Sequence, residues 1–243
     1  MTAVEPIIPV NLKDYDFIEK IGENAIGDIY SAKERSTQKN YCIKVINKKK
    51  LRNPARAKQV LETLSSLDHK NITKIYGVVE ISVSPDKIYI LLEHASFGTL
   101  SAYFKKSLGV SEQMAKDLFR QIVTAVYYLH SNKVAHCGLN PTSIMVDSNG
   151  TVKINDSGLG PLCIRHSLME RYYLAPEAIG RSNNNYDGFK ADMYSLGIIF
   201  RYIINESGAP MTPVCQTLFE KLTNEKEFLR PSTGAILKNK WFA

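Results

Sequence analysis

The order of the secondary-structure signals along the chain constrains its fold more than any single motif. Short segments rich in β-branched and aromatic residues, each bounded by turn residues, fill the first third and predict β-strands. They are 15–22, 29–35, 40–47, 75–83 and 87–93. One helix interrupts them after Pro54, where apolar residues follow the helical period. Helical patterns dominate after Gly98, so the sequence predicts an α+β fold with a β-rich lobe and a mainly helical lobe.

The helical part begins with an amphipathic helix for which Ser111 is a candidate N-cap. Its apolar stripe consists of Leu118, Ile122, Ala125, Val126 and Leu129. The sequence Asp-Ser-Asn-Gly at 147–150 predicts a hairpin turn between strands at 144–146 and 152–154. A further apolar helix is expected from about 191 to 204.

Composition limits the class of protein. With 243 residues and 44% hydrophobic content, the chain can build one large domain or two lobes with ample core. No apolar stretch is long enough to span a membrane, and the first ten residues lack the basic region of a secretory signal. The four cysteines are far apart and form no C-x-x-C pair. We therefore expect an intracellular, cytoplasmic protein with reduced thiols.

The net charge is +7, and basic residues gather between 48 and 58. They are Lys48, Lys49, Lys50, Arg52, Arg56 and Lys58. This cluster is either a solvated face or a docking surface for an acidic partner. Aromatic residues do not interleave with it, which argues against nucleic-acid binding.

The segment 136–143, His-Cys-Gly-Leu-Asn-Pro-Thr-Ser, resembles the catalytic loop H-R-D-L-K-P-E-N of protein kinases. Further kinase landmarks follow the family's order along nearly the whole chain. They are Ile21-Gly22, Gly27-Asp28-Ile29, Tyr41-Cys42-Ile43-Lys44, Asp156-Ser157-Gly158, Ala175-Pro176-Glu177, Asp192, Ser195-Leu196-Gly197 and Arg230-Pro231. The chain is identified as a degenerate member of the eukaryotic Ser/Thr protein kinase superfamily, a pseudokinase.

The resemblance implies a set of boundaries. Residues 1–11 would be an N-terminal extension, and 12–243 the kinase-like domain. Its N-lobe would cover about 12–93, its connector 93–98 and its C-lobe about 99–243.

The resemblance also implies that the catalytic loop has lost its chemistry. Gly138 stands where a kinase has its catalytic Asp, Asn140 replaces the phosphate-contacting Lys, and Ser143 replaces the metal-binding Asn. Cys137 replaces the Arg that grips an activation-loop phosphate. No catalytic residue is therefore expected at these positions.

Lys44 matches the family's phosphate-contacting lysine, but its usual glutamate partner falls on Val60. Glu62 lies about 200° around the helix from Val60 and should face elsewhere. Lys44 could bind nucleotide or could form a purely structural pair with Asp156, which is also the one weak candidate for a metal ligand. The Phe that normally follows this Asp is Ser157.

The remaining nucleotide positions are better preserved. Gly22 and Gly27 keep two glycines of the phosphate loop, whereas Asn24 replaces the middle one, so the segment is either a phosphate loop or a plain turn. By resemblance the adenine pocket would consist of Ile29, Cys42, Leu92, Glu93, Ala95 and Met145. The same residues could simply fill the core between the lobes.

The scaffold positions of the family are retained. Glu177 and Arg230 match a buried ion pair, and Asp192 matches the residue that binds the catalytic-loop backbone beside His136. We expect these four to have structural roles.

A preserved frame without the chemistry predicts a scaffold or allosteric regulator that binds another protein, with weak ATP binding if any and little use of magnesium. Neither nucleic acid nor membrane is an expected partner. The alternatives are a divergent active Ser/Thr kinase that takes its base from elsewhere, and a nucleotide sensor.

Overall fold

The computed structural model describes residues 11–23, 27–80, 84–94, 98–107, 110–157, 159, 168–179 and 186–242, with backbone only at 56, 58, 168 and 169. These residues form two compact units. The first contains residues up to His69 and the stretch from Thr73 to His94, and the second contains 70–72 and the described residues from Gly98 onward. The first is built on an antiparallel sheet and the second is mainly helical, which confirms the predicted α+β fold.

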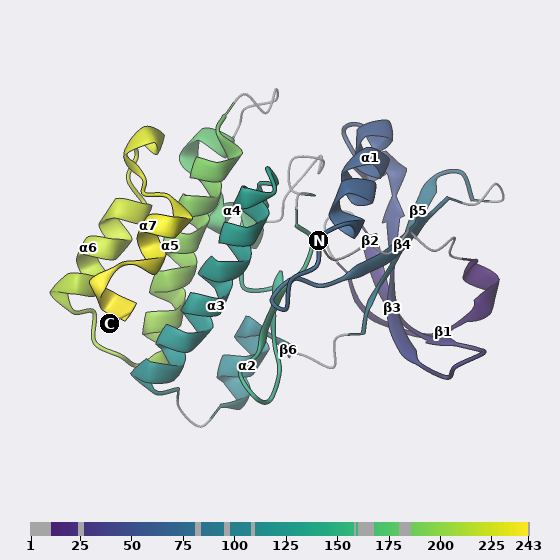
Figure 1. The fold of residues 1–243 in the computed structure, drawn as a ribbon, viewed down its shortest axis with the longest axis horizontal. Helices are drawn as coiled ribbons and strands as arrows, with labels where there is room; N and C mark the ends of the chain where they lie inside the picture. The colour runs from purple at the N-terminus through teal and green to yellow at the C-terminus, as the bar shows by residue number, and fades with distance from the viewer. Residues whose placement is uncertain are drawn as a thin grey trace, which may run out of the picture. The chain divides into compact units, whose positions relative to one another are not determined.

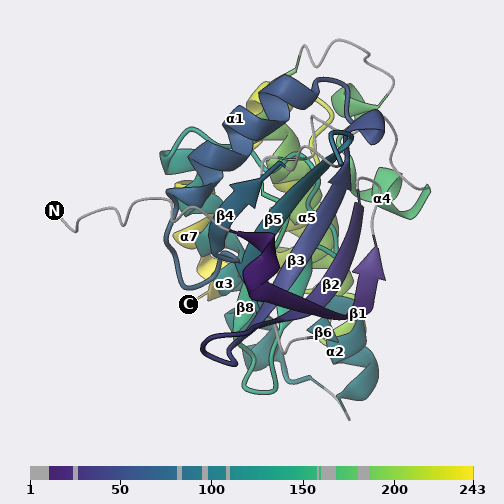
Figure 2. The same cartoon turned by 90° about the vertical axis from the view of Figure 1, so that its right-hand side faces the viewer.

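The first unit holds a five-stranded sheet in the order β1-β2-β3-β5-β4, seen side by side in Figure 2. The strands are β1 (Tyr15–Glu23), β2 (Gly27–Glu34), β3 (Asn40–Asn47), β4 (Ile75–Val79) and β5 (Lys87–Glu93). Short 3₁₀ turns, η1 (Leu12–Asp14) and η2 (Lys48–Lys50), precede β1 and follow β3. Helix α1 (Pro54–Ser65) packs against β4.

The strand register divides the side chains of the sheet between two faces. Directly opposed residues on paired strands share a face, whereas successive residues alternate. Ile29, Lys44 and Ile90 are cross-strand partners on one face, which we call the Lys44 face. Asp28 and Val45, with Tyr89 beyond them, lie on the other, the Val45 face.

The second unit is built around α3 (Glu112–Ser131) and α5 (Gly188–Ser207), which pack against each other (Figure 1). A small sheet pairs β6 (Gly98–Thr99) with β7 (Ile144–Val146) and β7 with β8 (Val152–Ile154). The remaining elements are α2 (Leu100–Lys106), α4 (Leu168–Tyr173), η4 (Pro176–Ala178), α6 (Pro213–Leu222), η5 (Glu227–Leu229), α7 (Thr233–Leu237) and η6 (Lys240–Phe242).

Local signals explain the two long helices. The Ser111 side chain accepts a hydrogen bond from the Met114 amide at 3.2 Å, so it caps α3. All five residues of the α3 stripe are buried. Asp187 caps the start of α5, and Gly208 ends it in the left-handed conformation, φ 69°, that favours glycine.

The segment 70–72 is joined to the second unit by backbone and side-chain hydrogen bonds. The Asn71 amide nitrogen donates to the Val152 carbonyl at 2.8 Å, and the Ile154 amide donates to the Asn71 carbonyl at 2.9 Å. Ile72 also forms a parallel bridge with Ile154. The second unit therefore includes residues 70–72, which lie in the sequence between α1 and β4 of the first unit.

None of the helices in the described ranges combines the length and the apolar character needed to cross a bilayer.

Candidate functional site

A buried carboxylate near the start of α5 holds the start of the 136–143 loop. Asp192 is 0% exposed. It accepts hydrogen bonds from the backbone amides of His136 and Cys137, each at 2.7 Å, and lies 2.9 Å from the His130 ring nitrogen Nε2. An ionised carboxylate that accepts backbone amides forms stronger hydrogen bonds than a neutral group. Asp192 thus fixes the backbone of the loop.

His136 and Cys137 are both buried behind this anchor. The His136 ring nitrogen Nε2 lies 2.8 Å from the Asn155 carbonyl oxygen, and burial lowers the pKa of the ring, which keeps it neutral. A neutral ring must then donate its Nε2 hydrogen to Asn155. Burial raises the pKa of the Cys137 thiol well above its usual value, and Asp192 adds to the effect. Cys137 has φ 55° and offers no charged group.

The Asn140 side chain is hydrogen-bonded to its own loop. Its nitrogen Nδ2 donates to the Gly138 carbonyl at 3.0 Å. Its oxygen Oδ1 accepts from the amide and the hydroxyl of Thr142, at 2.8 and 2.6 Å, and from the Ser143 amide at 3.2 Å. The residue is only 8% exposed. At the position of the family's phosphate-contacting lysine, this side chain therefore organises a turn.

The Ser143 hydroxyl is bonded to the backbone of the same turn. It donates to the Asn140 carbonyl at 2.9 Å and lies 3.1 Å from the Asn140 amide. Ser143 is 6% exposed. Gly138 has no side chain, so it supplies neither an acid nor a base. The three positions of the loop that carry kinase chemistry thus hold groups that are absent or already engaged.

Asp156 follows β8 and has a left-handed backbone, φ 60°. Its neighbour Ser157 is 5% exposed, and the Ser157 hydroxyl has no hydrogen-bond partner among the described residues. Gly158, the last residue of this motif, lies outside the described residues.

Glu177 and Arg230 form a buried, two-pronged ion pair. Arg230 Nη2 donates to Glu177 Oε2 at 2.9 Å, and Nη1 bonds to Oε1. The remaining Arg230 donors reach the carbonyls of Lys190 at 2.9 Å and Asn224 at 2.8 Å. The guanidinium also lies 5.2 Å from the centre of the Tyr194 ring. The pair ties η4 to the end of the chain.

The nucleotide candidates of the first unit gather on the Lys44 face. Ile29 is directly opposite Lys44, and Leu92 is directly opposite Cys42. Lys44 is 1% exposed. Glu93 ends β5, whereas Ala95 lies outside the described residues. The structure therefore brings four of these candidates to one face of the sheet.

The remaining nucleotide and metal candidates lie elsewhere. Met145 lies in β7 and Asp156 after β8, both in the second unit. The pairing of Lys44 with Asp156 stays a prediction.

The two retained glycines of the first unit differ in what surrounds them. A Cβ on Gly27 would lie 2.1 Å from the Val45 carbonyl oxygen, so close packing of β2 on β3 alone requires glycine there. A Cβ on Gly22 would meet only the end of the Ile29 side chain, at 3.9 Å. Asn24 lies outside the described residues. The packing of β2 on β3 thus explains the glycine at position 27 without any role in phosphate binding.

On α1, Val60 is partly buried and Glu62 is exposed. The position of the family's pairing glutamate therefore carries an apolar side chain.

The family's magnesium ligands are only partly retained. Its preferred ligands are oxygens of carboxylates, amides and water in octahedral geometry. Ser143 replaces an amide ligand, and its hydroxyl is bonded to Asn140. No group of three His, Cys, Asp or Glu side chains within the described ranges could hold a metal ion.

The turn formed by Asn140 was missed in the sequence. The signal was present, because an Asn side chain that accepts from backbone amides two residues later is a common turn former, and Pro141 follows it. The resemblance to kinases points only to the lysine that Asn140 replaces, and it does not predict the turn that Asn forms.

Comparison with known proteins places these features in a family. The protein kinase domain model matches residues 15–210. Human NUAK family SNF1-like kinase 2 is 34% identical over 199 residues, which cover 79% of this chain and 31% of the relative. CBL-interacting serine/threonine-protein kinase 15 of Arabidopsis thaliana is 28% identical over 263 residues, or 94% of this chain and 61% of the relative. The chain thus spans less than two thirds of the length of either relative.

Proposed function

The chain belongs to the protein kinase family, and we propose that it is a pseudokinase that acts in signalling by binding other proteins, as a scaffold or an allosteric partner. The observation that carries this proposal is the state of the 136–143 loop. Gly138 has no side chain, and the side chains of Asn140 and Ser143 bond to the loop backbone. The loop is therefore built to keep its shape.

The catalytic contributions that the loop lacks are large, which supports the proposal. A positioned general base contributes a factor of roughly 10²–10⁴ to the rate, or about 3–5 kcal/mol of barrier. The lost lysine and metal ligand act on the same transition state, so their effects need not add. A kinase that turns over roughly 1–100 times per second would fall to about 10⁻⁴–1 per second from the loss of the base alone.

We expect at most trace transfer of radiolabelled phosphate from ATP to protein, with either magnesium or manganese, because no side chain at position 138 can accept the proton of an acceptor hydroxyl. The assay compares the wild-type chain with Lys44→Ala. A trace signal from a contaminating kinase will be equal in the two proteins. Turnover at an ordinary kinase rate that disappears in Lys44→Ala would overturn the proposal.

Kinases normally bind ATP with magnesium. For this chain we infer weak nucleotide binding at most and little contribution from magnesium. Lys44 is retained as a candidate contact for the phosphates, but Ser143 is a poor substitute for an amide ligand of the metal. Asp156 alone remains as a strong ligand.

A thermal-shift titration tests this inference. Saturation to 100 times Kd adds about 2.7 kcal/mol of stability to any protein that binds the ligand only when folded. We expect a small shift with millimolar ATP, and we expect the same shift when magnesium is replaced by EDTA. A large shift that requires magnesium would show that the metal site is intact.

A divergent active Ser/Thr kinase is the second candidate. It is favoured by the names of the relatives, which are kinases, and by the retention of Lys44 and Asp156. The transfer assay separates it from the pseudokinase.

We also propose that the protein works in the cytoplasm. Cys42, Cys137 and Cys215 are buried free thiols, which suits a reducing compartment.

A further inference from the structure

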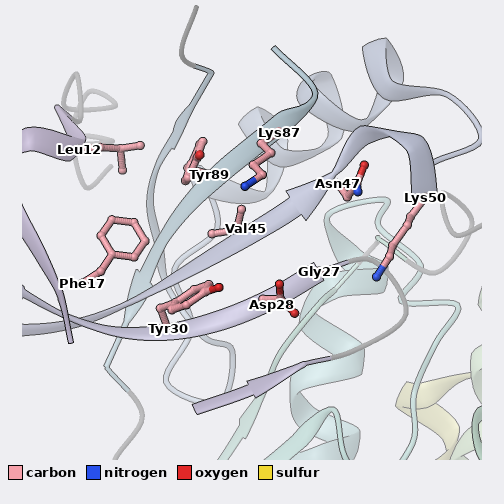
Figure 3. Close-up of a pocket in the computed structure, with 10 residues that line it drawn as sticks. All are labelled: Leu12, Phe17, Gly27, Asp28, Tyr30, Val45, Asn47, Lys50, Lys87 and Tyr89. Carbon is pink, nitrogen blue, oxygen red and sulfur yellow. The ribbon is translucent and has the colours of Figure 1, made fainter. Parts of the chain in front are cut away.

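The Val45 face of the first unit carries a cavity of about 480 Å³, which we call the Val45 groove. It lies on the side of the sheet opposite Lys44, so of the nucleotide candidates only Gly27 lines it. Figure 3 shows Leu12 and Phe17 at one end of the groove, Lys50 at the other, and the Lys87 amino group between them near Tyr89 and Val45. Its volume lies within the range of roughly 300–1,000 Å³ that is usual for ligand sites.

The apolar end is formed by Leu12, Phe17, Tyr30, Val45 and Tyr89. Leu12 and Val45 pack on a buried cluster within the sheet that includes Tyr89, so this part of the groove has a firm base. Phe17 is 43% exposed, and its ring meets the Tyr30 ring edge-on with centres 5.7 Å apart. An exposed aromatic pair beside a cavity provides a ready contact for a bulky apolar side chain.

Two lysines of the groove lining have no carboxylate partner within the described part of the chain. They are Lys50 and Lys87. The one carboxylate in the lining, Asp28, is 2.9 Å from Lys20, which Glu23 also contacts at 2.6 Å, so the two lysines of the lining outnumber its single carboxylate.

The neighbouring lysines differ from these two. Lys48 pairs with Glu80 at 3.0 Å, and Lys49 pairs with Asp86 at 3.2 Å. Within the basic cluster of the sequence, Lys48 and Lys49 are thus balanced by carboxylates.

We propose that the Val45 groove binds an extended acidic peptide segment of a partner protein. Its carboxylates would pair with Lys50 and Lys87, and a bulky apolar residue would lie over Val45 beside the Phe17 and Tyr30 pair. Apolar contact supplies affinity, and charge complementarity selects the partner. A nucleic acid fits less well, because two lysines can neutralise few phosphates of its backbone. The inference rests on the protein-binding role proposed above.

The test uses the full chain and the probe peptide acetyl-Glu-Asp-Leu-Glu-Phe-Asp-Glu-amide. Methyl NMR should show shifts of the Leu12 and Val45 signals on titration, whereas Val214 and Leu229 of the second unit stay unchanged. A peptide in which Gly replaces Leu and Phe should bind at least about tenfold more weakly, because it lacks the apolar anchor.

Two variants with the same change in net charge locate the binding. Lys50→Glu/Lys87→Glu should weaken the probe about tenfold by fluorescence anisotropy. Lys105→Glu/Lys106→Glu, at the exposed end of α2, should change it less than about twofold, because neither lysine lines the groove and exposed charges are screened by salt. Both variants should melt at the wild-type temperature, because all four side chains are exposed.

Three results would overturn the proposal. One is the absence of shifts at Leu12 and Val45. Another is an equal loss of affinity in the two charge variants, which would mean non-specific attraction. The third is a chain without residues 1–10 that binds the probe about tenfold more tightly and shows shifted Leu12 and Val45 signals before any peptide is added. That result would make the chain's own N-terminal segment the occupant. None of these measurements involves phosphoryl transfer, so the docking site and the pseudokinase assignment fail separately.

Discussion

Arg230→Met is expected to lower the free energy of unfolding by about 3–5 kcal/mol, because it leaves the Glu177 carboxylate buried without its partner. Arg230 is 1% exposed and Glu177 9%. The arginine also donates to the carbonyls of Lys190 and Asn224, which would lose a partner each. Methionine keeps most of the length of the side chain, so little of the loss comes from an empty cavity. Urea denaturation at pH 7 measures the change.

A double variant separates the ion pair from the rest of the effect. Arg230→Met/Glu177→Met removes both charges, and we expect it to be more stable than Arg230→Met alone. Arg230→Lys should recover only part of the loss, since an ammonium group cannot reproduce the two-pronged contact. If Arg230→Met lowers the free energy of unfolding by less than about 1 kcal/mol, the ion pair does not stabilise the fold as its burial and geometry indicate.

Periodicity and caps were sufficient to predict most elements. The bounds of β3 and β5 agree with the predicted segments, because each is a short run of β-branched and aromatic residues between clear turn signals. The α3 stripe is buried as its spacing requires. Of the predicted strand at 75–83, the structure has β4 at Ile75–Val79, and 81–83 lie outside the described residues.

Two features could not be read from local patterns. The transfer of 70–72 to the second unit depends on hydrogen bonds of Asn71 and Ile72 to β8, more than 80 residues away for Asn71 and Val152. The Val45 groove depends on the register of several strands, which brings Tyr30, Val45 and Tyr89 together although they are far apart in sequence. A strand's own pattern shows that its residues alternate between faces, but it does not show which neighbours they meet.

The candidate site was predicted as a list of positions, and the structure adds what each side chain does. The resemblance to the kinase catalytic loop implies which residues are missing from the 136–143 loop. It does not show that Asn140 and Ser143 replace them with hydrogen bonds inside the loop. We therefore expect that restoring a kinase residue in this loop will destabilise the protein.

Asn140→Lys, which restores the lysine of an active kinase, is expected to lower the free energy of unfolding by about 2–4 kcal/mol. The change removes the acceptor of the Thr142 and Ser143 amides and the donor to the Gly138 carbonyl. A buried donor that loses its acceptor costs about 1–3 kcal/mol. A lysine at this site must also leave the buried position that Asn140 occupies, since an unpaired charge is not tolerated there.

Asn140→Asp is the matched control, because it keeps the Oδ1 acceptor and loses only the donor to Gly138. We expect it to cost about 1–2 kcal/mol, clearly less than the lysine variant. Chemical denaturation of the three proteins side by side provides the comparison. An Asn140→Lys chain as stable as the wild type would mean that the loop does not depend on this turn, and the case for a loop maintained for its shape would lose its main support. A clear loss of stability on restoring the kinase residue would mean instead that this loop is stabilised by the residues that make it unfit for phosphoryl transfer.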